Sequence, residues 1–325
     1  MRTITTPHIR SISLNAIDRE DDSFRMTFNP DLHRLKASMQ EVGLFNPVIL
    51  RGRERLQVVA GFRRILVAWS LGWEMIEAQV LDPDDITIKG GLILNFFENL
   101  GTRTFNLIEA SMVVNGLVHR GNLDRNQVRE EILPLLGLQG GSKVFREVSS
   151  LVGLIDEWKD LVVKEEIALP NAARISGLSP EDQEALLRAI AGLKLGHNKM
   201  RQCLELAEEI CQRDKISLSQ LFDSAPFLQL GKDQERNITE KTEMFRRALK
   251  RMRYPELTRQ EEAFREARRQ LTLPPSTRLE PPEFFEGDAL KVTVRFRSPE
   301  ELKGVFEQLM SAANSEALKR LLAMV

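Results

Sequence analysis

Two short groups of residues in the first hundred positions have the types and spacing that phosphate chemistry requires. An apolar run ends at Ala60, Gly61 follows, and Arg63 and Arg64 stand at the start of an expected helix. Glycine lets the backbone approach a ligand closely, amides at a helix start point outward, and arginine donors match phosphate oxygens. The pattern predicts a phosphate site. Taken alone, it is more often a glycine turn with two solvated arginines.

Glu98 and Asn99 form the second group and follow another apolar run. A carboxylate beside an amide oxygen is the ligand type that Mg²⁺ prefers when phosphates complete its shell. These two residues are therefore the candidate metal ligands and the candidate catalytic residues. On spacing alone, Asn99 with nearby Gly101 is favoured as a helix cap or turn.

Alternating strand-like and helix-like stretches must position these groups. Period-two and helical spacings of apolar residues, broken by glycine and proline, predict a mixed α and β region. The expected strands are 9–14, 47–51, 56–60 and 75–81, the second and third forming a hairpin, and the expected helices are 30–43 and 62–71. Residues 84–95 fit either a helix or a strand.

From Asn106 to about Arg253 the spacing of apolar residues is helical. Within this region, 124–136 and a helix starting after Gly140-Gly141 fit a helix-turn-helix. The first residues of a recognition helix face base edges, which nominates Ser142, Lys143 and Arg146 for DNA binding. The same pattern also describes a plain helical hairpin.

The C-terminal part begins with a shift in composition. Prolines at 274, 275, 281 and 282 follow a charged helix, which predicts an interdomain linker. A strand over 290–296 and a helix capped by Ser298 come next. One strand with one or two helices cannot close a core alone, so pairing through an antiparallel edge predicts a homodimer.

Composition narrows the classes of function. The net charge is −1, so any contact with DNA must be local, and no apolar run approaches the length of a membrane span. Cys203 and Cys211 are too far apart on a helix for a disulfide, and the four histidines have no ligand spacing. The arginines of 246–269 alternate with glutamates, which favours a solvated, salt-bridged helix over a nonspecific DNA track.

The order of these residues, from about Ile12 to Ala191, resembles the ParB family of chromosome and plasmid partition proteins. That family has a "G-x-x-x-P-V-hydrophobic-hydrophobic-R" segment, a "G-E-R-R-x-R-A" box, and an "E-N-x-Q-R" box before a helical DNA-binding domain. The corresponding residues here are Gly43 to Arg51 (GLFNPVILR), Gly61 to Ala68 (GFRRILVA) and Glu98 to Thr102 (ENLGT), with Asn106, Ile108, Glu109 and Ala110 continuing the register. Three boxes in order are a fairly specific signal.

The resemblance implies a CTP pocket that acts as a switch in a dimeric DNA clamp. Gly61, Arg63 and Arg64 would lie at the phosphates, Glu98 and Asn99 near Mg²⁺, and Gly43, Asn46 and Pro47 in the part of the pocket that holds the base. DNA is the implied partner. A partition ATPase is weakly supported, because only Arg2 and Arg10 give the N-terminus basic character.

The chain departs from the family's boxes at three positions. Phe62 stands where the first box has Glu, Val67 where it has its third Arg, and Thr102 where the second box has Arg, with Arg103 one residue on. Losing the carboxylate predicts a changed base preference, weaker hydrolysis, or binding without turnover. A slow CTPase activity is therefore an open expectation.

Together these observations predict an α+β protein with a ParB/sulfiredoxin-like nucleotide-binding domain (1–105), a helix-turn-helix domain (106–230), a charged helical linker (231–280) and a small strand-helix domain (281–325). We expect a cytoplasmic, nucleoid-associated protein of chromosome, plasmid or phage segregation. The alternatives are a phosphotransferase or nuclease on the same fold, or a nucleotide-independent transcription regulator. Sulfiredoxin chemistry is excluded because no cysteine lies near Gly61 to Arg64.

Overall fold

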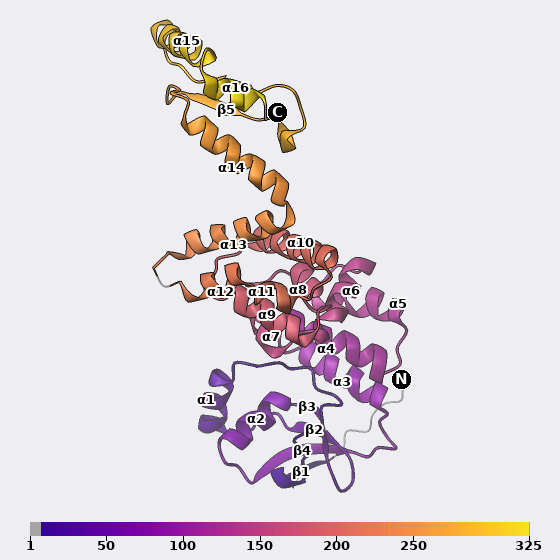
Figure 1. Ribbon diagram of the computed structural model, residues 1–325. Helices are drawn as coiled ribbons and strands as arrows, with labels where there is room; N and C mark the ends of the chain where they lie inside the picture. The colour runs from indigo at the N-terminus through magenta and orange to yellow at the C-terminus, as the bar shows by residue number, and fades with distance from the viewer. Residues whose placement is uncertain (1–7, 234, 325) are drawn as a thin grey trace. The chain divides into compact units, whose positions relative to one another are not determined.

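The computed structural model describes residues 8–233 and 235–324 (Figure 1). The chain divides into two compact units, residues 1–187 and 188–325. Each unit has its own elements and its own apolar cores, and each is treated by itself below.

A mixed four-stranded sheet organises the first unit, with strand order β1-β4-β2-β3. β1 runs antiparallel to β4, β4 runs parallel to β2, and β2 runs antiparallel to β3. The strands are β1 (Ile9–Ser13), β2 (Val48–Arg51), β3 (Gln57–Ala60) and β4 (Met75–Leu81). The expected hairpin is β2 and β3, whose register shifts between Ile49 and Leu50.

Period-two alternation gives this sheet two apolar faces. One face, with Val48, Leu50 and Val58, packs in a core with helices α1 (His33–Val42) and α2 (Phe62–Ser70). The other face supplies Ile49 and Val59 to a second core shared with the helices that follow. The sheet is thus covered on both sides.

The second core of this unit is built mainly from helices. Its centre includes Phe96 of α3 (Ile88–Leu100), Val113 of α4 (Leu107–Asn115) and Phe145 of α6 (Ser142–Ser150). A π-helical segment follows α4, and a helical segment over 125–136 precedes α6. The remaining elements of the first unit are the 3-10 helix Leu14–Ala16, the π-helical segments Gly116–Arg120 and Val128–Ile132, α5 (Arg125–Gln127), the 3-10 helices Pro134–Leu136 and Leu151–Gly153, α7 (Asp156–Val163), α8 (Leu169–Ile175) and most of α9 (Pro180–Ile190).

The second unit begins as a helical bundle. α10 (His197–Asp214) packs along α13 (Ile238–Arg253), and α11 (Leu218–Phe222) and α12 (Ala225–Lys232) complete it. Phe222, Phe227 and Phe245 form an aromatic cluster with ring centroids 5.2–5.9 Å apart. Cys203 is buried in this bundle, and burial raises the pKa of its thiol to about 11.

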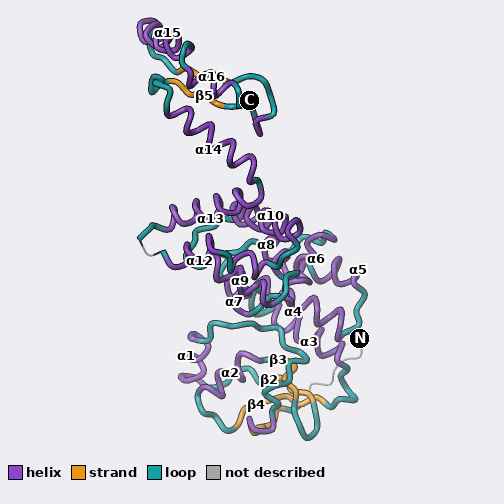
Figure 2. The backbone as a smooth tube through the Cα atoms, viewed as in Figure 1, coloured by secondary structure: helices purple, strands orange, loops and turns teal. Residues whose placement is uncertain are grey.

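The unit ends in a small α and β subdomain that includes a hairpin. β5 (Thr277–Glu280) pairs antiparallel with β6 (Lys291–Val294), and these are the strands near the C-terminus in Figure 2. They pack with α14 (Pro255–Arg269), α15 (Pro299–Ala313) and α16 (Glu316–Leu322); Phe264, Leu279 and Leu321 are buried. A 3-10 helix covers Glu283–Phe285.

The expected α+β class is confirmed, and the open stretch 84–95 contains most of α3. Residues 231–280, expected as a linker, differ from that expectation. Phe245 and Leu249 of α13 are buried in the bundle, and Phe264 and Ala267 of α14 are buried against the C-terminal hairpin region. Because charged residues are so frequent in these two helices, the few apolar residues on their buried faces did not stand out in the sequence. The strand over 290–296 also has an antiparallel partner, β5, within the chain.

Candidate nucleotide pocket and DNA-contacting helix

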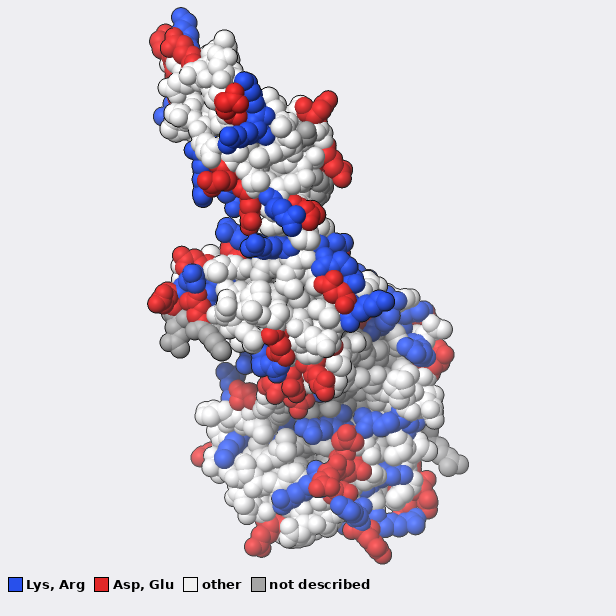
Figure 3. Space-filling model, in the orientation of Figure 1, with Lys and Arg blue, Asp and Glu red and all other residues white. Residues whose placement is uncertain are grey.

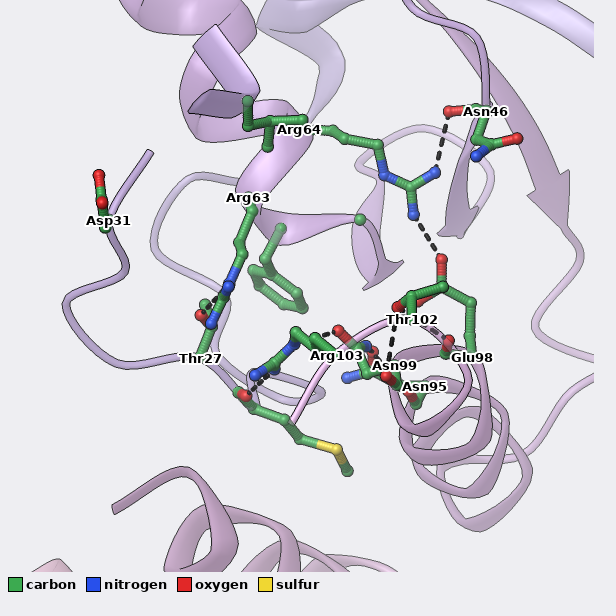
Figure 4. Close-up of a pocket in the computed structure, with 14 residues that line it drawn as sticks. Thr27, Asp31, Asn46, Arg63, Arg64, Asn95, Glu98, Asn99, Thr102 and Arg103 are labelled. Atoms are coloured by element: carbon green, nitrogen blue, oxygen red, sulfur yellow. Dashed lines mark hydrogen bonds and ion pairs between the residues drawn. The ribbon is translucent and has the colours of Figure 1, made fainter. Parts of the chain in front are cut away.

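Residues from all three predicted boxes line one cavity in the first unit, of about 310 Å³, with Asn46 coming from the first box (Figure 4). Gly61, Arg63 and Arg64 come from the start of α2, and Glu98 and Asn99 from the last turn of α3. The rest of the lining is Met26, Thr27, Asp31, Leu35, Asn46, Phe62, Asn95, Thr102 and Arg103. This volume lies at the small end of the range for ligand pockets.

Gly61 joins β3 to α2 in a conformation that needs glycine. Its φ of 98° is left-handed, and a Cβ atom there would lie 2.8 Å from Cγ1 of Val48 and 3.2 Å from Nε of Arg64. A side chain would therefore both strain the backbone and collide with its neighbours. The glycine brings the amides of the first turn of α2 to the cavity wall.

Arg64 crosses the cavity from α2 to α3. Its Nη1 donates to the carbonyl oxygens of Asn46 and Pro47, at 2.9 and 3.0 Å, and its Nη2 lies 2.6 Å from Oε1 of Glu98. Two carbonyls and one carboxylate thus fix the guanidinium in place. Asn46 lines the pocket, whereas Pro47 and Gly43, also predicted there, lie outside the lining. Pro47 contributes only its carbonyl oxygen to Arg64, and Gly43, with φ 74°, ends α1.

Arg63 and Arg103 share one carboxylate beneath the cavity, that of Glu109 on α4. Arg63 Nη2 lies 2.9 Å from Oε1 and Arg103 Nη1 lies 2.5 Å from Oε2. Burial lowers the pKa of Arg103, the Glu109 carboxylate raises it, and the charge of Arg63 lowers it. Arginine stays protonated in proteins, so the cluster carries two positive charges around one buried negative charge.

The side chain of Asn99 is held by its protein neighbours. It accepts from Nε of Arg103 at 2.7 Å, while the amide nitrogen donates to the carbonyl and side-chain oxygens of Asn95. Glu98 is about one third exposed and lines the cavity. Magnesium bound with phosphates needs only one or two protein carboxylates. Glu98 fits that role, and Asn99 in this rotamer fits a structural role. Over the described part of the chain, no group of three metal-ligating side chains occurs.

Phe62 replaces a carboxylate with an apolar side chain that belongs to the packing. It is partly buried, lines the cavity, and contacts both apolar cores of the unit. The carboxylates that line the cavity are therefore Glu98 and Asp31, the latter just before α1. Figure 4 shows Asp31 apart from the Arg64–Glu98 pair.

Three residues that line or support the pocket were not predicted from the sequence as pocket residues. Thr27 lies in an irregular segment, where no periodicity marks it. Glu109 forms a capping box with Asn106, so its spacing indicates a helix start. Arg103 stands one position after the family's arginine, and the structure turns it under the cavity. Arg103 and Glu109 are brought together by the attraction between buried opposite charges, which the spacing of residues along the sequence does not reveal.

The candidate recognition residues lie at the start of α6. Ser142, Lys143 and Arg146 are exposed, and Phe145 and Val148 on the opposite side are buried in the core. Arg129, from the preceding helical segment, donates to Oγ of Ser142 at 3.3 Å. Figure 3 shows Lys and Arg interleaved with Asp and Glu on the visible face of the first unit.

No helix among the described residues is long and apolar enough to cross a membrane. Arg2 lies outside the described residues.

A small mixed sheet with an arginine-lined cavity, followed by helices, is the class of domain that this site defines. Residues 2–96 match the family model described as the ParB N-terminal domain. This part of the chain is therefore similar to that domain family, and the resemblance to ParB-type proteins, at low identity, is confirmed.

Curated relatives extend the likeness beyond that domain. A probable chromosome-partitioning protein ParB of Helicobacter pylori is 26% identical over 187 residues, which are 57% of this chain and 60% of the relative. A nucleoid occlusion protein of Bacillus mycoides is 25% identical over 188 residues, 57% of this chain and 62% of the relative. The matches thus span about three fifths of each of these two relatives.

Solved structures include a C-terminally truncated ParB from Caulobacter crescentus complexed with CTP-gamma-S, at 23% identity and TM-score 0.26, covering 57% of this chain and 99% of that one. The same protein complexed to the centromeric parS site aligns at 22% identity and TM-score 0.31, covering 56% and 90%. Scores of this size do not define a shared arrangement of the whole chain.

Proposed function

We propose that this chain is a DNA-binding protein of the ParB type, acting in segregation or nucleoid occlusion, whose N-terminal unit binds a nucleotide. One observation carries the nucleotide proposal: Gly61, Arg63, Arg64 and Glu98, chosen from sequence order, line a single cavity. The family resemblance of the three boxes makes CTP with Mg²⁺ the first candidate.

In this proposal each side chain has a defined task. The amides after Gly61 and the free edge of Arg63 hold phosphate oxygens, because forked donors and a helix start both favour anions. Arg64, fixed by the carbonyl oxygens of Asn46 and Pro47, orients the same group, and Glu98 is the residue that would hold Mg²⁺. A bound Mg²⁺ supplies neutralisation of the phosphate charge.

Turnover is expected to be slow at most. Phe62 supplies no carboxylate, and Glu98 is committed to Arg64 or to the metal. A water-activating base within hydrogen-bond reach of the terminal phosphate is what fast hydrolysis needs. The pocket is thus proposed as a binding switch first and as a CTPase second.

The nucleotide proposal is tested by titrating the purified chain with CTP, ATP and GTP in Mg²⁺, with and without duplex DNA. We expect CTP to bind, and Arg64→Ala to weaken binding by about 10- to 100-fold, the worth of one or two charge-assisted hydrogen bonds. Arg53→Ala is the matched control, since Arg53 is exposed and pairs with Asp82 outside the cavity. Absence of binding to all three nucleotides would overturn the proposal, and phosphate transfer from ATP to a small molecule would favour a phosphotransferase.

The DNA contact is proposed for the exposed start of α6. Removing Lys143 or Arg146 should weaken binding to duplex DNA, and each lost phosphate contact should lower the salt slope by about one. Arg259→Ala removes an equal charge from α14, where Arg259 pairs with Glu256, and should change neither quantity. Equal effects of all three substitutions would place DNA binding elsewhere.

A homodimer is proposed through the C-terminal subdomain. Val292, Phe306 and Met310 are exposed there, and they line an apolar depression of about 550 Å³ with β5 and α15. A second copy of the same surface is the simplest cover for it. Phe306→Asp should convert the dimer to a monomer in light scattering, whereas a monomeric wild type would overturn this part.

A further inference from the structure

A second hollow of the first unit, of about 610 Å³, follows α4 and shares only Thr27 with the lining of the arginine-lined cavity. Its lining includes one stripe of α4 and of the π-helical segment after it, with residues at helical spacing: Ile108, Met112, Asn115 and His119. The lining outside this helical stretch comes from segment 22–28, which forms no helix or strand, and from α7 with Val152. We call this hollow the α4 groove.

Basic side chains outnumber acidic ones in the α4 groove. The basic residues are Arg25, His119, Arg120 and Lys159, and the acidic residues are Asp22 and Asp156. Both aspartates form ion pairs with neighbouring basic residues, but their side chains are 79% and 78% exposed, so water screens these pairs. The groove therefore favours a ligand that carries negative charge.

Arg25 has the largest unused binding capacity in the groove. Its Nε donates to the carbonyl oxygen of Thr27 at 3.2 Å, and no described residue accepts from its Nη1 or Nη2. No carboxylate among the described residues pairs with it. The two free nitrogens of such a guanidinium match the two oxygens of a carboxylate.

Asn115 offers the opposite kind of group. Its Nδ2 donates to the carbonyl oxygens of Ser111 and Ser149, each at 2.9 Å, which fixes the orientation of the side chain. No described residue donates to its Oδ1, although Asn115 lines the groove. This oxygen can accept a hydrogen bond from an amide of a ligand.

Apolar side chains complete the lining of the groove. Val152 is 49% exposed, and Phe28 and Met112 are partly buried. Methionine is unbranched and flexible, so it adapts to the shape of a partner. A DNA backbone has phosphates but neither amide donors nor apolar side chains, so it would leave Asn115 and these three residues unused. A peptide supplies carboxylates, amides and apolar side chains together.

We propose that the α4 groove is a docking site for a short acidic segment of a partner protein, in which an apolar side chain is flanked by aspartate or glutamate. The apolar side chain packs on Met112 and Phe28. A flanking carboxylate binds the free nitrogens of Arg25, and a backbone amide donates to Oδ1 of Asn115. This site does not depend on the proposed nucleotide binding.

Selection from a randomised peptide library displayed on phage tests this site, with the full chain as bait and Arg25→Glu for counter-selection. We expect enrichment of sequences with aspartate or glutamate around a leucine, methionine or phenylalanine. An enriched peptide, labelled for fluorescence anisotropy, should bind Arg25→Glu about tenfold or more weakly, because attraction becomes repulsion. Arg34→Glu is the matched control: it makes the same change of charge at an exposed position of α1 and should alter affinity by less than about twofold.

A second variant covers the case in which Arg25→Glu fails to fold. Val152 is half exposed, so Val152→Glu should keep the circular dichroism spectrum of the wild type and still weaken peptide binding by about tenfold. No acidic enrichment, or equal peptide affinity in the wild type and the groove variants, would overturn the proposal. Loss of duplex DNA binding in Arg25→Glu as large as in Lys143→Ala would assign the groove to DNA instead. Conversion of a dimer to a monomer by Val152→Glu would assign it to a second copy of the chain.

Discussion

Arginine and glutamate form ion pairs in two regions of this molecule, the floor of the candidate pocket and the helices α13 and α14. In the pocket, Arg103 is 13% exposed and Glu109 is 1% exposed. On α14, Arg259 and Glu256 are each 75% exposed at nearly the same separation. The same two residue types are locked together in one region and solvated in the other.

Burial, and not the number of ion pairs, therefore decides how much a charged side chain contributes to the structure. A pair on a solvated helix is worth little, because water screens it and two long side chains must be ordered. Buried charges cannot be left single, so they hold their partners and the elements that carry them. The pocket network therefore joins α2, α3 and α4, whereas the pairs along α14 remain largely exposed to solvent.

Removing the carboxylate that Arg63 and Arg103 share should have the largest effect on stability. Glu109→Ala leaves Arg63 and Arg103 without a counter-charge, and we expect a loss of about 3–5 kcal/mol in the free energy of unfolding. Urea denaturation measures this loss. A loss under about 1 kcal/mol, the range of an exposed ion pair, would mean that the buried pairs of the pocket stabilise the protein no more than the exposed pairs of α14.

One glycine substitution should have opposite signs in the two units. Gly61→Ala meets Val48 and a left-handed backbone, and should destabilise by about 1–3 kcal/mol. Gly304→Ala lies inside α15 with nothing within 4 Å of the new methyl group, and should stabilise by about 0.5–1 kcal/mol. Thermal unfolding of both variants measures these shifts, and the same sign in both would contradict the close packing at Gly61.

The exposed pairs of α14 should be nearly silent. Arg259→Ala is expected to change the free energy of unfolding by less than about 0.5 kcal/mol. The same urea experiment used for Glu109→Ala provides the measurement. A loss as large as that of Glu109→Ala would mean that α14 is held by its charges.

The smallest effect concerns acid pH. Hydrogen bonds from Arg53 lower the pKa of Asp82 to about 2. Its contribution to stability is complete above the ordinary pKa near 4 and is lost as pH falls through about 2. Both side chains are exposed, so we expect no change in stability above pH 4. In Arg53→Ala, an NMR titration should show the Asp82 midpoint moving back toward 3.8; an unchanged midpoint would contradict the assignment of the cause.

Much of the first unit could be predicted from the sequence because its signals are local. The period-two alternation of apolar residues predicted the hairpin of β2 and β3. Gly61 marked the start of α2, and Gly43 marked the end of α1. The cavity itself required the topology: Glu98 meets Arg64 because α3 returns across β3. From the sequence, the contact between Glu98 and Arg64 could be expected only because the order of the three boxes resembles that of the ParB family.

The remaining features depend on contacts that spacing does not encode. Thr27 reaches Glu109 across 82 positions, and Phe62 gains its place by packing against two cores. In the second unit, α13 and α14 carry many charged residues around the buried Phe245 and Phe264. This composition predicted a linker where the structure has two packed helices. The strand β5, which follows the prolines at 274 and 275, has four residues, too few for a period-two pattern to mark it in the sequence.

A nucleotide is proposed to bind where Gly61, Arg63, Arg64 and Glu98 meet. The most direct measurement is the dissociation constant for CTP with Mg²⁺ in wild type, Arg64→Ala and Arg259→Ala, by calorimetry at one salt concentration. We predict binding that weakens by about 10- to 100-fold in Arg64→Ala and is unchanged in Arg259→Ala. Equal constants for all three chains, or no binding in the wild type, would contradict it.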